Sequence, residues 1–287
     1  MILGKDREAV IRNIKAAAES GDFYAKVETG DPVLTPEESR AITQNYTETR
    51  GHLQNRFAAF FARRLANVAT AHINRDTEIV GAERIPPSLR GVLITSNHFD
   101  PLENTVIRHL TRKLGRRRLH IISQTGNFAM TGILGFLMRH ADTIPISAEP
   151  RYLARDLTLV LREKLVEKGE AVLLYPEQEM WFRYRKPRPP KNGAYYYAAK
   201  LGVPILSCFV EIVDTEKEEA PDFRAVRFVL HILGVLTPDP ERSVKENTER
   251  LATEDYALKC ACYERVYRKK LTYDFDPADI AGWKGTL

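Results

Sequence analysis

The sequence predicts an α/β fold in which a largely parallel central sheet is flanked by helices and preceded by an N-terminal helical region. From residue 78 onward, short apolar runs rich in β-branched residues alternate with helical segments, which is typical of βαβ units and of a sheet covered on both faces. Before that point, apolar residues recur at helical spacing. We therefore expect a helical region at 1–75 and an α/β domain at 76–287.

Three helices are expected in the N-terminal region. Residues 6–18 form the first, because their apolar residues recur three and four positions apart. Thr35, Pro36 and Glu38 begin the second, with Thr35 as N-cap and Glu38 at the capping-box position. The third, at 57–73, has an apolar face that either lies on a membrane interface or packs on the core with solvated arginines. This face comprises Phe57, Phe60, Phe61, Leu65 and Val68, beside Arg56, Arg63 and Arg64.

The α/β domain is expected to alternate strands with helices along the chain. The apolar runs predict strands at 78–80, 91–96, 119–123, 171–175, 203–212 and 224–233. The segments with helical periodicity predict helices at 102–114, 132–140, 151–168, 193–201 and 247–271.

The composition suits a folded protein with an anionic partner. Of the 287 residues, 44% are hydrophobic, which is ample for a packed core, and the net charge of +5 is mild. Two basic groups stand out, and they indicate a phosphate, a membrane surface, a nucleic acid or simply a solvated face. No recognised nucleic-acid module accompanies them, so we expect no nucleic-acid partner. The groups are Arg108, Arg112, Lys113, Arg116, Arg117 and Arg118, and Arg183, Arg185, Lys186, Arg188 and Lys191.

The cysteines and the first residues indicate the cellular compartment of the protein. Cys208, Cys260 and Cys262 are odd in number and lack metal-ligand spacing with histidine, which favours a reducing compartment without disulfides or a metal site. The first residues lack a signal-peptide apolar region, and no apolar run approaches the roughly 20 residues that span a bilayer. We expect a cytoplasmic protein, either soluble or peripheral on the inner face of the membrane.

The stretch Asn-His-Phe-Asp-Pro-Leu-Glu at 97–103 is the most informative in the chain. It follows the strand expected at 91–96, so His98 lies beyond the carboxyl end of a strand, where α/β sheets place their active sites. Asp100 and Pro101 indicate a helix start, with Asp100 as N-cap. A histidine with a carboxylate nearby can act as a general base.

Five motifs resemble, in order and spacing, those of the glycerolipid acyltransferase family that makes phosphatidic acid. The resemblance covers roughly residues 78–215. It implies transfer of a fatty acyl group from a thioester, on coenzyme A or acyl carrier protein, to a hydroxyl of a lysophospholipid or related glycerolipid. It implies no further cofactor and no metal. The motifs are Asn97-His98-x-x-x-x-Glu103, Ile144-Pro145-Ile146, Tyr175-Pro176-Glu177, Lys191-x-Gly193 and Val203-Pro204-Ile205.

The resemblance assigns His98 as general base and the carboxylate five residues later as its partner. The family has Asp at that position and this chain has Glu103, so Glu103 is the expected partner and Asp100 the alternative. Asp100 and Glu103 also fit a capping box, and a Glu103 turned back to the cap would not face His98. In that case the chain would be a catalytically inactive family member that binds a membrane surface or a protein partner.

The motifs near the acceptor depart further from the family. Where the family has Pro-Glu-Gly-Thr-Arg, this chain has Glu177 but no arginine, and Ser147-Ala148 stand where Asp-Arg usually end the second motif. Phosphate binding is therefore expected from the basic residues that follow, Arg183, Arg185, Lys186 or Lys191. The residues we expect to bind substrate are Asn97, Asp100, Glu177, Arg183, Arg185, Lys191 and Gly193.

Overall fold

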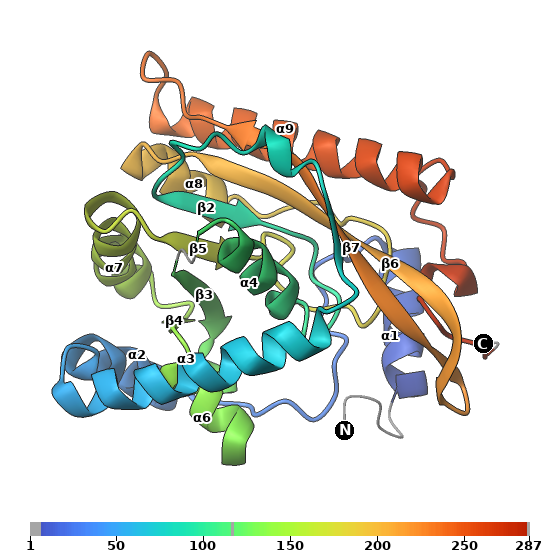
Figure 1. The fold of residues 1–287 in the computed structure, drawn as a ribbon, viewed down its shortest axis with the longest axis horizontal. Helices are drawn as coiled ribbons and strands as arrows, with labels where there is room; N and C mark the ends of the chain where they lie inside the picture. Colours follow the sequence, from blue (N-terminus) through green and yellow to red (C-terminus); the bar gives the residue numbers. More distant parts are fainter. Residues whose placement is uncertain (1–6, 116–117, 286–287) are drawn as a thin grey trace.

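A computed structural model describes residues 7–115 and 118–285 and contains, within these ranges, a seven-stranded sheet (Figure 1). The strand order is β1-β7-β6-β2-β5-β3-β4, and all neighbours pair in parallel except β6 and β7. The predicted fold class, α/β with a largely parallel sheet, is confirmed. The strands are β1 (Glu78–Val80), β2 (Val92–Thr95), β3 (Leu119–Gln124), β4 (Thr143–Ile146), β5 (Ala171–Leu174), β6 (Ile205–Ala220) and β7 (Phe223–Leu236).

Helices cover both faces of the sheet because the central strands are apolar on both sides. Val92 and Ile94 of β2 pack in a core with α4, whereas Leu93 between them packs in a second core with α7, α8 and α9. The helices are α1 (Arg7–Ser20), α2 (Pro36–Thr49), α3 (Leu53–Ile73), α4 (Asn104–Lys113), α5 (Thr125–Phe128), α6 (Gly132–His140), α7 (Thr158–Arg162, between π-helical segments Tyr152–Leu157 and Glu163–Glu167), α8 (Gly193–Leu201) and α9 (Val244–Tyr267).

Several elements differ from the sequence prediction, and the short helix α5 is one that was not predicted. The strand β4 is absent from the predicted strands because it contains Pro145, which cannot donate a ladder hydrogen bond. β4 pairs with β3 alone at the end of the sheet, and an edge strand tolerates proline. The hairpin of β6 and β7 is also longer than predicted, because antiparallel pairing continues into the exposed, charged residues beyond Asp214.

The N-terminal helices join the α/β domain along two different surfaces. On α1, the predicted apolar residues Val10, Ile11 and Ile14 are buried in a core that also contains Trp181 and Phe182 from the loop after β5. The expected Thr35–Glu38 capping box begins α2. The long helix α3 packs against α4 and α6 (Figure 1). Residues of the predicted N-terminal region therefore share a core with the loop that follows β5.

Candidate active site

The loop between β2 and α4 is fixed at its start by Asn97. The Asn97 side chain accepts a hydrogen bond from the backbone N–H of Val210 at 2.8 Å and donates one to the Val210 carbonyl at 3.0 Å. Ser96 donates to the same side-chain oxygen at 3.2 Å. Because this buried amide is bound to β6, Asn97 fixes the place of His98 beyond the strand end. The sequence motifs predict that Asn97 binds substrate, but its side chain bonds the protein backbone.

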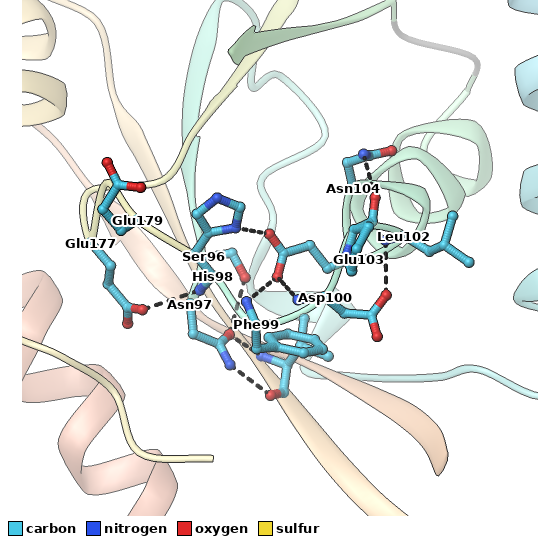
Figure 2. A network of polar contacts seen from close by, with 12 residues as sticks. Ser96, Asn97, His98, Phe99, Asp100, Leu102, Glu103, Asn104, Glu177 and Glu179 are labelled. Atoms are coloured by element: carbon cyan, nitrogen blue, oxygen red, sulfur yellow. Dashed lines mark hydrogen bonds and ion pairs between the residues drawn. The ribbon is translucent and has the colours of Figure 1, made fainter. Parts of the chain in front are cut away.

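Glu103 contacts both the imidazole and the turn before α4 (Figure 2). One carboxylate oxygen bonds His98 Nδ1, and the other accepts the backbone N–H groups of Phe99 and Asp100, the latter at 3.0 Å. The side chain of Glu103 is 2% exposed and that of His98 is 22% exposed. The expectation that a Glu103 turned back to the cap would not face His98 is therefore wrong, because each function uses a different oxygen.

This contact decides which imidazole nitrogen can react. A carboxylate on Nδ1 favours the tautomer with its proton on that nitrogen, so that Nε2 carries the lone pair. Asp100, the alternative partner, instead uses its Oδ1 to accept the Leu102 N–H at 2.8 Å, which closes the turn and delays the start of α4 to Asn104. Burial raises the pKa of Asp100 to about 6.

Tyr175 packs its ring flat on the imidazole of His98. The two ring centroids are 4.2 Å apart and the planes differ by 6°. The phenol hydroxyl is buried, and this burial, with the nearby Glu103 carboxylate, raises the pKa of Tyr175 well above its ordinary value. The motif Tyr175-Pro176-Glu177 marked this position, yet sequence reasoning assigned the tyrosine no role. Its place directly after a buried strand was the available signal.

Glu177 is buried between the backbone of His98 and the side chain of Arg188. Its Oε2 accepts the backbone N–H of His98 at 3.2 Å and the Arg188 guanidinium at 3.0 Å, and its Oε1 accepts the Arg188 backbone N–H at 3.0 Å. The residue is 3% exposed. Both oxygens thus contact the protein itself, in contrast to the expected place in the acceptor pocket. Arg188, which sequence reasoning listed only as part of a basic group, is its partner.

Arg183 and Arg185 both pair with acidic side chains of the protein. Arg183 is buried and its Nη2 lies 2.6 Å from Glu219. Arg185 donates to Asp214 at 2.5 Å and to the Ala278 carbonyl at 2.6 Å. These acceptors come from the β6–β7 hairpin and the C-terminal turn, far along the chain from the loop. Both arginines therefore already have acidic partners within the protein, and their expected phosphate-binding role stays a prediction.

Lys191 and Gly193 are the exposed members of the expected binding set. The ammonium of Lys191 lies 3.5 Å from the centroid of the Tyr24 ring, and its backbone N–H donates to the Pro176 carbonyl at 2.8 Å. Gly193 begins α8, and a side chain added there would meet no atom within 4 Å. Lys191 is thus a cation beside the site loop that remains open to solvent.

Two members of the first basic group, Arg108 and Arg118, have partners within the protein, whereas Arg112 and Lys113 are exposed. Arg108 is buried and donates to the Ala141 carbonyl, and Arg118 pairs with Asp142. Arg116 and Arg117 lie outside the described residues. Within residues 7–115 and 118–285, no group of three or more His, Cys, Asp or Glu side chains could hold a metal ion, and no helix is long and apolar enough to cross a membrane.

Comparison with known proteins agrees with the resemblance seen in the motifs. Residues 76–211 match the family model described as Acyltransferase. The crystal structure of the 1-acyl-sn-glycerophosphate (LPA) acyltransferase PlsC from Thermotoga maritima aligns with a TM-score of 0.50 and 16% identity, over 82% of this chain and 96% of that chain, a likeness that shows the fold. No curated protein sequence matches significantly. The chain therefore contains an acyltransferase region at residues 76–211 and has a fold similar to that of PlsC, in agreement with the glycerolipid acyltransferases that its motifs resemble.

Proposed function

We propose that this enzyme transfers a fatty acyl group from an acyl thioester to a glycerolipid hydroxyl, with His98 as general base. The observation that carries the proposal is the buried Glu103 carboxylate on His98 Nδ1, which leaves Nε2 for the substrate. A carboxylate in this position orients the imidazole and stabilises the imidazolium. The alternative is a catalytically inactive family member, and a Glu103 that faces away from His98 would have been its sign.

The reaction balances without a covalent enzyme intermediate. Nε2 of His98 takes the proton of the acceptor hydroxyl while the oxygen attacks the thioester carbonyl carbon. The resulting tetrahedral intermediate collapses by breaking the carbon–sulfur bond. The thiolate then leaves with the proton from the imidazolium, which regenerates the neutral histidine. The products are the ester and the free thiol, and no further cofactor is required.

Mass spectrometry of reaction products tests this proposal. Pure protein is incubated with an acyl-coenzyme A or acyl-carrier-protein thioester and a panel of lysophospholipids and lipid alcohols. We expect acylated product from at least one lysophospholipid, and none from the His98→Ala variant. Product from the variant at the wild-type rate contradicts the base assignment. Lack of product from every combination with the folded wild-type protein contradicts acyl transfer and favours the inactive alternative.

We also propose that α3 lies on the surface of an anionic membrane. Its buried residues Ala62 and Thr70 face the protein, whereas the apolar residues on the opposite face are exposed. Phe57 is 67% and Phe61 is 62% exposed. Aromatic rings on one helix face beside arginines suit the headgroup level of a bilayer. The exposed apolar residues are Leu53, Phe57, Phe60, Phe61, Leu65 and Val68. The three free cysteines fit the cytoplasmic face.

Vesicle sedimentation tests the membrane proposal. The double variant Phe60→Ser with Phe61→Ser should bind vesicles of phosphatidylcholine and phosphatidylglycerol more weakly than the wild type. The matched control is Val33→Ser, because Val33 is 91% exposed but lies outside α3. Equal binding by all three proteins contradicts the proposal. Unfolding midpoints should stay unchanged, because the replaced side chains are on the surface.

A further inference from the structure

The segment after β5 contains two buried ion pairs, and one of them surrounds the backbone of His98. Lys186 pairs with Asp279 at 2.6 Å, and Arg188 pairs with Glu177 at 3.0 Å. All four side chains are at most 4% exposed. Removing Arg188 would leave the buried Glu177 carboxylate without its cation, whereas removing Lys186 would leave Asp279 with the more distant Lys269, whose Nζ lies 3.7 Å away. The two pairs differ in their surroundings. Within the described residues, only the pair of Arg188 and Glu177 contacts the loop between β2 and α4, called the catalytic loop below.

The guanidinium of Arg188 donates hydrogen bonds to three separate segments of the chain. Nε and Nη2 donate to Glu177, and Nη1 donates to the Phe23 carbonyl at 3.0 Å. Nη2 also reaches the carbonyls of His98, at 3.4 Å, and of Glu179. The planar guanidinium can bind a carboxylate and several carbonyls together, which a lysine ammonium cannot do with the same geometry.

The same segment binds the backbone of the catalytic loop on both sides of His98. Glu177 accepts the His98 N–H at 3.2 Å, and the Trp181 N–H donates to the His98 carbonyl at 3.1 Å. Arg183 donates its backbone N–H to the Phe99 carbonyl at 2.7 Å. The backbone of His98 therefore depends on residues 177–188, whereas its side chain depends on Glu103 and Tyr175.

We propose that Arg188 is a positioning residue for acyl transfer, which together with Glu177 fixes the main chain of His98 so that its imidazole meets the substrate. The inference rests on the proposed function of His98 as base. Catalytic groups displaced by about 1 Å lose about 100-fold in rate. Arg188 also joins the site to the N-terminal segment through Phe23, so the segment before α2 contributes to the position of the base.

Two matched variants separate positioning from stability. Arg188→Met and Lys186→Met each break a buried ion pair on the same segment, and both should lower the urea midpoint of unfolding. With saturating acyl thioester and lysophospholipid, we expect Arg188→Met to lower kcat about 100-fold while KM changes little. Lys186→Met should keep kcat within about 3-fold of the wild type. Equal losses of kcat in the two folded variants overturn the proposal.

A double variant keeps the test informative if Arg188→Met folds poorly. Arg188→Met with Glu177→Gln removes the unpaired buried charge, so the midpoint should recover in part, although the Gln amide can accept only one of the two backbone N–H groups that Glu177 accepts. Its kcat should remain low, because the contact of Arg188 with the His98 carbonyl is still missing. Recovery of kcat together with stability would show a structural role alone and would contradict the positioning role.

A readout without turnover distinguishes this inference from the proposed function. In protein labelled with ¹⁵N-histidine, the His98 ring signal is identified by its loss in His98→Ala. The signal should shift in the double variant and stay in place in Lys186→Met. An unshifted signal in the double variant overturns the positioning role, whether or not the wild-type protein forms acylated product. Absence of product overturns the acyl-transfer proposal only.

Discussion

Replacing Glu103 with Gln should move the proton of the neutral His98 ring from Nδ1 to Nε2. Two backbone donors, the N–H groups of Phe99 and Asp100, face one carboxylate oxygen, so the amide oxygen of Gln must take that place. The amide NH₂ then faces His98 Nδ1 and forces that nitrogen to become an acceptor. The proton moves to Nε2, which can no longer take the proton of the acceptor hydroxyl. The analogous Asp-to-Asn change in serine proteases costs about 10⁴ in kcat, or about 5 kcal/mol.

The loss of kcat is measured by following thiol release from an acyl thioester at a saturating concentration of lysophospholipid. We expect Glu103→Gln to lower kcat by about 10³–10⁴ without a comparable change in KM. Glu103→Asp, which restores the residue usual in the family, should keep more activity, because it remains an anion even if it is about 1.5 Å shorter. A Glu103→Gln enzyme within about 10-fold of the wild type would refute the tautomer argument.

Four further variants change three other residues of the site. His98→Ala should lower acyl transfer by at least about 10² with little change in the unfolding midpoint, since the ring is partly exposed. Asp100→Asn should raise the free energy of unfolding by up to about 3 kcal/mol at pH 8 and about half of that at pH 5 in urea titrations. The cause is burial, which raises the pKa of Asp100 to about 6, so that stability falls as pH rises from about 4 to 6. Tyr175→Phe should keep kcat within about 3-fold, whereas Tyr175→Leu, which loses the stacked ring, should lower it about 10-fold.

Local patterns in the sequence were sufficient for most strands of the sheet and for the position of His98. The apolar run before Asn97 predicts β2, and the position of His98 beyond that strand follows from it. The Thr35–Glu38 capping box is equally local, because its donors and acceptors lie within three residues. In each case the interacting groups are neighbours along the chain, so their spacing in the sequence carries the geometry.

The roles of the basic residues could not be predicted in the same way. Arg183 pairs with Glu219 and Lys186 with Asp279, so each charge is neutralised by a residue that only the folded chain brings near. The sequence shows several basic residues close to the site motifs, a pattern that is typical of a phosphate-binding pocket. It does not show which of them have internal partners. The stacking of Tyr175 on His98 likewise depends on the pairing of β2 with β5.

The Glu in place of the usual Asp follows from the double use of this side chain. The Glu103 carboxylate reaches past the turn to bond Nδ1 of His98 while its second oxygen still accepts the N–H groups of Phe99 and Asp100. In the proposed mechanism His98 serves only the chemistry, whereas the Asp100 side chain contacts only the turn. Because Glu103 does both, substitutions at 103 should change stability and kcat together, whereas those at 98 and 100 should separate the two. The Glu103 carboxylate thus couples the local fold to the proposed pair of His98 and Glu103.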